Sequence, residues 1–196
     1  ALRASNGHPE PYNIKYWELD NEVWSTQPDV YAALVNEFAP AMKKIDPDIR
    51  LIACGSGSLG KNPGQWPKGD EVVVNKVVPQ ISFISTHHYE GTGGYATGPA
   101  REEIFWDTLA EKISRSANPQ IKIYMSEWNL GTTDWRTGLY AAGLLNNFEH
   151  NSDKVTMACP ALFLRHISAP GWDNAFINFD HRKWYPAPNY VIMKLY

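Results

Sequence analysis

The chain has 196 residues, of which 43% are hydrophobic and 13% aromatic, and its formal net charge is -3. This composition is typical of one globular domain with a sizeable core, and it excludes a disordered chain. No run of Lys or Arg is present to neutralise phosphates, so nucleic acid is not an expected partner and a neutral substrate fits better. The longest apolar stretches have only the length of strands, so no membrane span is expected, and the first nine residues lack the apolar segment of an export signal.

Five short apolar runs predict β-strands. They lie near residues 14–22, 49–54, 81–87, 121–127 and 155–165, and their starts are 32 to 40 residues apart, which is the spacing of one βα unit. Strands that are apolar on both faces and alternate with helices predict an α/β fold in which helices cover a parallel sheet. The intervening helices are predicted at residues 29–45, 71–78, 101–116 and 134–150.

Apolar residues at helical spacing are expected to pack on the sheet, together with Trp106. Both cysteines, Cys54 and Cys159, lie within strand-like runs and are expected to be buried thiols. The apolar stripes of the three long helices are Val30, Leu34, Phe38, Met42 and Ile45; Ile104, Phe105, Leu109 and Ile113; and Trp135, Leu139, Ala142, Leu145 and Phe148.

Either a doubly wound sheet or a (β/α)8 TIM barrel would satisfy this pattern. Glycines and prolines gather at residues 55–69 and 91–99, which places the long loops at the carboxyl ends of strands, where a barrel builds its active site. A nucleotide site is disfavoured, because residues 55–60 match the Gly-x-Gly-x-x-Gly pattern only loosely. Five strands cannot close an eight-stranded barrel and would leave strand edges in water. We therefore expect residues 1–196 to form part of one catalytic barrel domain whose other strands come from a missing segment or a second polypeptide.

Two acids stand at the carboxyl ends of predicted strands, Glu22 after the first and Glu127 after the fourth. Two carboxylates at one rim of a barrel are the minimum requirement for cleaving a glycosidic bond, and retaining enzymes hold them roughly 5 to 5.5 Å apart. Asn21 is suited to donate a hydrogen bond to the sugar hydroxyl beside the reacting carbon, and Tyr89 to hold the nucleophilic carboxylate. Trp128 would supply an apolar wall.

Other acids near the first strand are alternatives. Strict alternation would point Asn21 and Glu22 to opposite faces, so we expect the strand to bulge or end there. Glu18 and Asp20 are alternative catalytic acids, but alternation places Glu18 lower in the barrel, where we expect an ion-paired structural acid.

No metal and no cofactor are expected. His87 and His88 with Glu90 suggest a metal site, but adjacent strand residues diverge and no third His lies at ligand spacing. A serine hydrolase is disfavoured, because the serines lack a Gly-x-Ser-x-Gly elbow. The eight tryptophans leave open a non-catalytic sugar-binding surface, although Trp106 and Trp135 lie on helix stripes and are expected in the core.

At these positions the sequence resembles the α-L-arabinofuranosidases of glycoside hydrolase family 51, which are retaining enzymes of the large (β/α)8 clan. The resemblance implies that the chain carries strands 4 to 8 of the barrel. The matching segments are residues 6–18 followed by Asn21 and Glu22 at the fourth strand, 85–89 with the sixth-strand His-x-Tyr, 125–129 at the nucleophile strand, and 175–180 with 187–196 at the barrel exit.

The resemblance implies that Glu22 is the acid/base and Glu127 the nucleophile, and that Asn21, His87 and Tyr89 contact the substrate or the nucleophile. It also implies an exo-acting hydrolase that releases arabinofuranosyl groups from plant cell-wall polysaccharides or oligosaccharides by double displacement. A β-xylosidase or endoglucanase of the same clan and a non-catalytic carbohydrate-binding fragment stay open as alternatives.

Two departures from the family pattern accompany this resemblance. Asp20 stands where the family usually has a small residue before Asn-Glu, which places an additional acid near the predicted site. The family's first three strands and its flanking β-sandwich have no counterpart within these 196 residues, and with them are missing residues that complete the sugar pocket.

Overall fold

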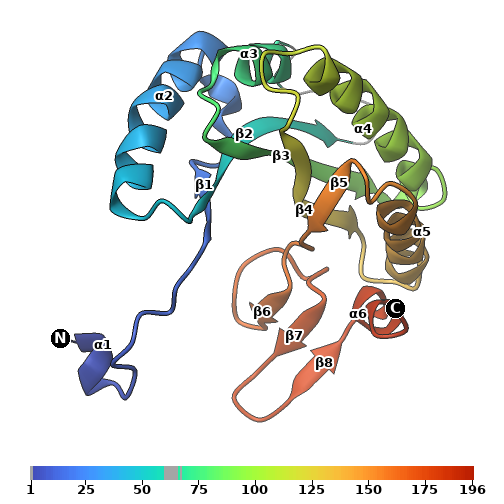
Figure 1. The fold of residues 1–196 in the computed structure, drawn as a ribbon. Coiled ribbons are helices and arrows are strands. Elements are labelled where there is room, and N and C mark those ends of the chain that lie inside the picture. Colours follow the sequence, from blue (N-terminus) through green and yellow to red (C-terminus); the bar gives the residue numbers. More distant parts are fainter. Residues whose placement is uncertain (1, 60–65, 67) are drawn as a thin grey trace.

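A parallel sheet with helices along one face dominates the computed structural model, which describes residues 2–59, 66 and 68–196 (Figure 1). The α/β fold with a parallel sheet is therefore confirmed. The strands, in sheet order, are β1 (Tyr16–Leu19), β2 (Arg50–Leu59), β3 (Ile81–Gly91), β4 (Lys122–Gly131) and β5 (Val155–Ala158), and the covering helices are α2 (Pro28–Ile45), α3 (Gly69–Lys76), α4 (Gly98–Ser114) and α5 (Arg136–His150). Among these residues, no helix is both long and apolar enough to cross a membrane.

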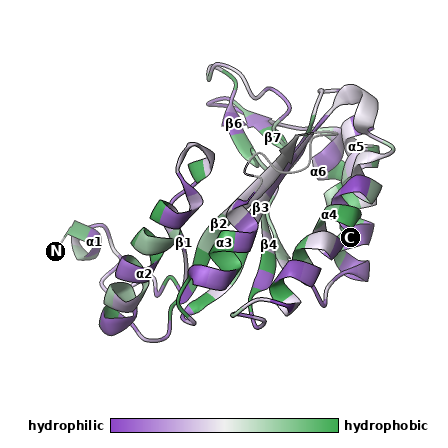
Figure 2. Cartoon of the chain, turned by 90° about the horizontal axis from the view of Figure 1, so that it is seen from above, coloured by the Kyte–Doolittle hydropathy of each residue, from purple (hydrophilic) through white to green (hydrophobic). Residues whose placement is uncertain are grey.

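The remaining elements lie outside this layer. Helix α1 (Leu2–Ser5) stands apart from the sheet in both views (Figures 1 and 2). A second sheet contains β6 (Leu164–His166), β7 (Ile177–Phe179) and β8 (Trp184–Pro186), with β6 parallel and β8 antiparallel to β7. Short 3-10 turns lie at η1 (Val23–Ser25) and η2 (Thr92–Gly94), and α6 (Pro188–Met193) is the last element in the described chain.

The last predicted strand, residues 155–165, is wrong as a single element. It divides into β5, which ends at Ala158, and β6, which begins at Leu164 in the second sheet. Pro160 lies between them, and a proline has no N–H to donate to the strand ladder. The residues on both sides of Pro160, from Met157 to Leu164, are apolar, so hydropathy does not mark the break.

The predicted loop at residues 55–69 begins inside a strand. Strand β2 continues through Gly55 and Gly57 to Leu59, whereas residues 60–65 and 67 lie outside the described residues. A Cβ on Gly55 would come within 2.5 Å of the Ser85 carbonyl oxygen of β3, and one on Gly57 within 2.6 Å of the Trp24 ring. These glycines therefore permit close packing inside a strand. In the second predicted loop, 91–99, η2 and the start of α4 follow the end of β3.

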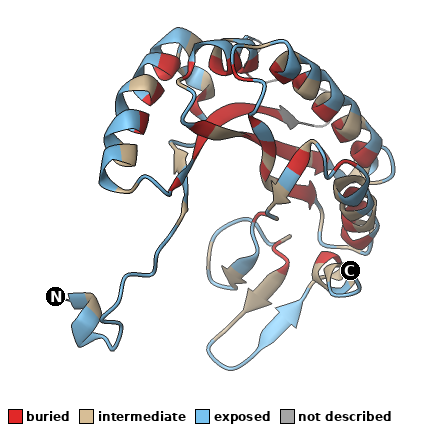
Figure 3. Ribbon diagram, in the orientation of Figure 1, coloured by how far each residue is buried: buried red, intermediate tan, exposed pale blue. Residues whose placement is uncertain are grey.

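The main core lies between the sheet and its helices, where the buried residues gather (Figure 3). Leu51, Ile84 and Ile123 of the central strands are buried, as are Trp106 of α4 and Leu144 of α5. Helices α2 and α4 carry both hydrophobic and hydrophilic residues around their circumference (Figure 2). Removing one apolar face of each helix from water supplies the main driving force for this layer.

The predicted apolar stripe of α2 has the wrong phase. Phe38 is 53% exposed, and Val30 and Leu34 are exposed with it, whereas the side chains packed on the sheet include Val35 and Ala39. Small residues on the sheet-facing side of α2 let the helix approach the strands closely. This buried side is therefore less hydrophobic than the exposed side that carries Phe38. Hydropathy alone therefore selected the wrong side of the helix.

Other burial predictions are also wrong. Trp135 is 61% exposed at the start of α5, whereas Trp106 is fully buried as expected. Cys54 is buried as expected, but Cys159 is exposed. Ile104, Ile45 and Leu139 of the predicted stripes are exposed as well.

Truncation of the buried indole should destabilise the chain far more than truncation of an exposed one. Trp106 is fully buried and stacks on Phe148 at 5.3 Å, so Trp106→Ala should lower the free energy of unfolding by about 3 to 5 kcal/mol. The control Trp135→Ala should change it by about 0.5 kcal/mol or less. Urea denaturation of both variants measures the difference, and equal losses would contradict this assignment of the core.

Candidate active site

A left-handed turn after β1 presents Glu22. The strand ends at Leu19, and Asp20 and Glu22 then adopt φ values of 76° and 50°. The predicted strand end before Asn21 and Glu22 is therefore confirmed. Such φ values are uncommon outside glycine, although Asp adopts them more readily than most residues, which accounts for an acid where the family usually has a small residue. The Asp20 Oδ1 accepts a hydrogen bond from the Asn21 N–H at 2.8 Å.

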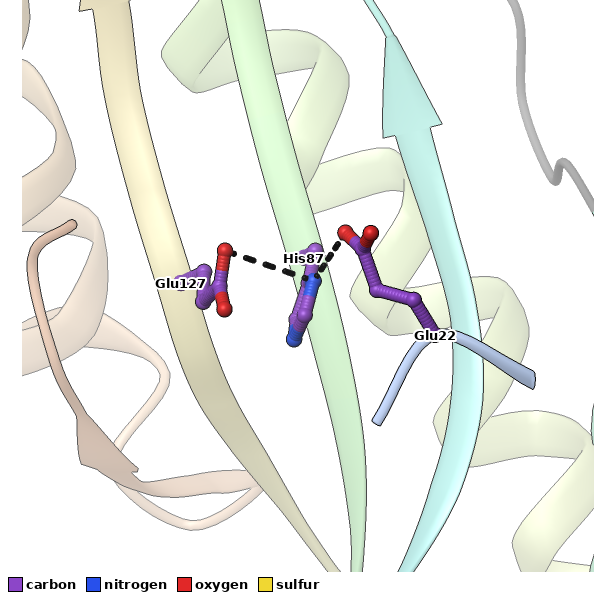
Figure 4. A group of neighbouring side chains, drawn as sticks. All are labelled: Glu22, His87 and Glu127. Atoms are coloured by element: carbon purple, nitrogen blue, oxygen red, sulfur yellow. Dashed lines mark hydrogen bonds and ion pairs between the residues drawn. The ribbon is translucent and has the colours of Figure 1, made fainter. Parts of the chain in front are cut away.

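Strand β3 places His87 between the two acids (Figure 4). The His87 Nδ1 lies 2.8 Å from Glu22 Oε1 and 3.6 Å from Glu127 Oε2. The adjacent His88 points to the opposite face, where its Nδ1 lies 2.9 Å from Glu102 Oε2 of α4. The predicted divergence of the two histidines is confirmed, because successive strand side chains alternate between faces.

A bulge in β4 sets the direction of Glu127. Thr86 pairs with Met125 and His87 with Glu127, so Ser126 is an additional residue in β4. An extra residue reverses the alternation of every residue beyond it. Because of the bulge, Glu127 lies on the same face as His87.

The same bulge turns Trp128 toward the helices. Trp128 is 1% exposed, lies edge-on to Phe176 at 5.3 Å and packs in a tilted orientation against Phe148 at 5.8 Å. The prediction that Trp128 forms a wall of the substrate site is therefore wrong, and Trp128 is a core residue.

The two acids meet although they are 105 residues apart in sequence. One oxygen of Glu22, one oxygen of Glu127 and one ring nitrogen of His87 all lie within 4.8 Å of one another. The Tyr89 hydroxyl donates a hydrogen bond to Glu127 Oε2 at 2.5 Å. Burial, followed by this contact with Glu127, raises the pKa of Tyr89, so the hydroxyl keeps its proton and remains a donor.

The same three groups are ligands that a divalent transition metal accepts. Each of Glu22, His87 and Glu127 offers one ligand atom to a common point. This set differs from the one suggested by the sequence, because His88 and Glu90 point to the other face. The same geometry also suits a site without a metal, in which His87 contacts both carboxylates directly.

Two further predicted residues lie beside this group. Asn21 is exposed next to Glu22, and its contact with substrate stays a prediction. Glu18 contacts the Cys54 Sγ at 3.7 Å, and burial raises its pKa against the opposing effect of a hydrogen bond from Ser85. Nearby His87 also lowers the pKa of Glu18, but the hydrogen-bond partners of Glu18 in the described chain are the neutral Ser85 and Cys54 instead of the ion pair that we expected.

Two tryptophans near the site were not selected from the sequence. The Trp24 ring lies edge-on to His87 at 5.8 Å, and its Nε1 donates to the Gly55 carbonyl at 3.0 Å. The Trp172 ring lies edge-on to Tyr89 at 5.4 Å. The position of Trp24 two residues after Asn-Glu was an available signal, whereas the loop around Trp172 carries no comparable pattern.

A parallel α/β sheet with two carboxylates close together toward the carboxyl ends of its strands is the arrangement that retaining glycoside hydrolases use. The family model described as "Alpha-L-arabinofuranosidase 1 domain" matches residues 1–101, and the one described as "Alpha-L-arabinofuranosidase C-terminal domain" matches residues 124–196. The chain belongs to the α-L-arabinofuranosidases of glycoside hydrolase family 51.

Similar proteins carry the same family name. A probable α-L-arabinofuranosidase C of Aspergillus fumigatus is 47% identical over 202 residues, and an α-L-arabinofuranosidase C of Emericella nidulans is 42% identical over 206 residues. Each match covers 85% of this chain and 40% of the relative. An α-L-arabinofuranosidase structure from Thermotoga maritima aligns with a TM-score of 0.83 and 25% identity, over all of this chain and 42% of that one. The chain thus spans about two fifths of the length of these relatives.

A buried charged network lies behind the site, between β3 and α4. His88 Nε2 lies 3.5 Å from Glu90 Oε1, its ring stacks on Tyr140 at 6.2 Å, and Arg101 Nε donates to Glu90 at 3.1 Å. Burial by itself lowers the pKa of His88, but its hydrogen bonds with Glu102 and Glu90 outweigh burial and raise the pKa to about 9. The charged imidazole therefore joins the end of β3, which carries the site, to the helix layer.

Stability should fall with rising pH because of His88. Its pKa rises from 6.5 to about 9 on folding, so the stabilisation is fully present below pH 6.5 and is lost as pH rises through about 9. Unfolding free energies measured from pH 6 to 10 should show this loss, and His88→Gln should flatten that part of the profile. The exposed control His181→Gln should leave the slope in place. An unchanged slope in His88→Gln would contradict the assignment.

Proposed function

We propose that this chain supplies both catalytic carboxylates of a retaining α-L-arabinofuranosidase. The observation that supports the proposal most directly is the approach of Glu22 and Glu127 to within 4.8 Å, which is close to the spacing of retaining enzymes. The names of the relatives favour arabinofuranosides over the substrates of β-xylosidases and endoglucanases. The proposed reaction releases arabinofuranosyl groups from plant cell-wall polysaccharides or oligosaccharides.

In the proposed mechanism, Glu127 attacks the anomeric carbon while Glu22 gives its proton to the leaving oxygen. A bond forms between the Glu127 carboxylate and the sugar as the glycosidic bond breaks. Water then attacks the glycosyl-enzyme, and Glu22 takes the proton of that water. The Tyr89 hydroxyl aims the nucleophile through its hydrogen bond to Oε2, and His87 holds the Glu22 carboxylate beside it.

We further propose that residues 1–196 contribute strands 4 to 8 of a (β/α)8 barrel. In support, the helices lie along one face of the sheet, whereas the opposite face carries polar groups of Ser85, His87 and Glu127. A barrel fills its interior from that second face and builds its active site at the carboxyl ends of the strands. Asn21 would contact the sugar at this rim.

The exposed edge of the sheet at β1 supports the proposal that a further segment lies beside it. Tyr16 and Trp17 of β1 are exposed at the end of the sheet, where β2 is the paired strand. On α2, Asp29 pairs with Lys76 of α3, and Phe38 follows nine residues later, which is two and a half helical turns. Phe38 therefore points away from α3, toward the side beyond β1.

We propose that a segment with the first three βα units covers this edge, either in a longer polypeptide or as a second chain. The relatives extend well beyond the matched region, because the matches cover 40% of their length. A helix of that segment would pack on Val30, Leu34 and Phe38, and a strand would pair with β1. The exposed apolar stripe of α2 would then become a buried contact.

The assembled enzyme tests the roles of the two acids. Glu127→Gln should reduce hydrolysis of an aryl arabinofuranoside by about 10³-fold or more, because the amide is a poor nucleophile. Glu22→Ala should slow arabino-oligosaccharides by about 10² to 10⁴-fold and activated aryl arabinofuranosides much less, because only poor leaving groups need the proton. The exposed control Glu149→Gln should behave as the unaltered enzyme.

Other results of this experiment separate the alternatives. Unchanged turnover in Glu127→Gln would remove that residue from the role of nucleophile, and equal slowing of all substrates in Glu22→Ala would argue against acid catalysis. Sugar affinity without any product from the unaltered protein would favour the binding-fragment alternative.

If a covering segment packs on α2, a charged residue at position 38 should destabilise the assembled enzyme. Phe38→Asp should hardly change the unfolding free energy of this chain alone, because the side chain is exposed, but should cost about 2 to 4 kcal/mol in the assembled enzyme, where the charge would be buried. Ile104→Asp, at an exposed position of α4 within the helix layer, should have little effect in either context. Chemical denaturation of both forms measures these values. The same small effect in both contexts would rule out a partner on this face.

A further inference from the structure

A loop between β6 and β7 reaches the candidate active site through Trp172. The indole lies edge-on to Tyr89, with ring centroids 5.4 Å apart and an angle of 68° between the ring planes. The Tyr89 hydroxyl in turn donates to Glu127 Oε2 at 2.5 Å. One side chain therefore separates Trp172 from the proposed nucleophile.

The backbone holds this tryptophan in a conformation that bulky residues rarely adopt. Trp172 has φ 55°, and Gly171 before it has φ 67°. A bulky side chain in the left-handed region is strained, and such strain is retained where the surroundings impose it, often at functional sites. Flexible packing in a surface loop would not require this conformation.

Two side chains of the second sheet anchor the loop on both sides of the tryptophan. The Arg165 Nε donates to the Gly171 carbonyl at 2.6 Å, and its Nη2 donates to the Ala169 carbonyl. The Asn178 Nδ2 donates to the Asp173 carbonyl at 3.1 Å. The residues flanking Trp172 are thus tied to β6 and β7, which anchors the backbone on both sides of the indole, and the contact with Tyr89 orients the ring.

The indole remains accessible in spite of this anchoring. Trp172 is 45% exposed, whereas Trp106 and Trp128 are almost fully buried in the core. A large apolar ring that is fixed, half exposed and one side chain away from a carboxylate pair offers a surface to a ligand with an apolar face. The C–H face of a sugar ring has this chemistry.

We infer that Trp172 forms a platform for the arabinofuranosyl ring that is transferred to Glu127, an inference that rests on the proposed function. In the sheet order, Glu22 approaches from the β1 edge and Trp172 from the segment after β5. Because Glu22 protonates the leaving oxygen, the leaving group lies on the β1 side. Trp172 on the other side therefore faces the transferred sugar.

The assembled enzyme with Trp172→Ala and Trp172→Phe tests the platform. Trp172→Ala should weaken the affinity for L-arabinose, measured by calorimetry, by about tenfold, the size of one aromatic contact. It should lower kcat/KM by a similar factor for an activated aryl arabinofuranoside and for an arabino-oligosaccharide, because both carry the same transferred ring. Trp172→Phe should retain most of both quantities, and it stays informative if the alanine variant does not fold. The matched control is Trp184→Ala, an exposed indole of β8 that packs on Tyr190, and it should change neither.

A second background separates direct contact from an effect through Tyr89. In Tyr89→Phe the ring remains but the hydrogen bond to Glu127 is lost, and Trp172→Ala should still weaken L-arabinose binding by about tenfold. No further loss in that background would reduce Trp172 to a positioning residue and overturn the inference. Unchanged affinity in Trp172→Ala, or a defect confined to the oligosaccharide, would also overturn it.

The affinity measurement also keeps the two proposals apart. If the unaltered enzyme hydrolyses no arabinofuranoside, the proposed function fails, whereas the L-arabinose affinity of Trp172→Ala still reports on the platform. If the unaltered enzyme is active and the variant binds L-arabinose normally, the platform alone fails.

Discussion

The parallel pairing of β3 with β4 is the constraint on which the candidate site depends. Their register brings His87 opposite Glu127, and the additional residue Ser126 turns Glu127 toward that histidine. Without the bulge, strict alternation would place the carboxylate on the helix side and Trp128 on the opposite face. A single inserted residue thus places Trp128 in the core and Glu127 in the candidate site.

The acids are held by two different devices. Glu127 lies inside the long central strand β4, whose helix-facing side chains are buried in the core. The sheet and the core together therefore set its position. Glu22 instead lies in a left-handed turn after a strand of four residues, and contact with His87 supports its carboxylate. The charged His88 on the far face ties the same stretch of β3 to α4. Strand β3 therefore carries a residue of the candidate site, His87, on one face and the residue that binds the strand to α4, His88, on the other.

Sequence reasoning succeeded where chemistry and topology agree. Parallel strands bring their carboxyl ends to one edge, so polar residues at those ends, Glu22, His87, Tyr89 and Glu127, could be grouped without coordinates. Trp128 was misassigned because a bulge depends on pairing with β3, which hydropathy does not encode. Trp172 escaped notice because it reaches the site from a loop between strands of three residues, too short to show a period.

The α2 stripe failed for another physical reason, whereas Leu109 and Ile113 of the α4 stripe are buried as expected. Hydropathy reports how much apolar surface a helix carries, not which neighbour covers it. On α2 the most apolar side points away from α3, while small residues such as Ala39 contact the sheet. The error in phase was therefore informative, because it pointed to an apolar surface of α2 that stays exposed within the described part of the chain.

The open edge at β1 has a further consequence under the proposed assembly with a covering segment. Among the described strands, β1 pairs only with β2, and its other edge, beside exposed apolar residues, is a template for any further strand, including β1 of a second copy. Self-association and productive assembly would then compete for one surface, and local concentration would decide between them. A covalent connection to the complementary segment would favour the productive route, which gives a kinetic reason for keeping both parts of the sheet in one polypeptide.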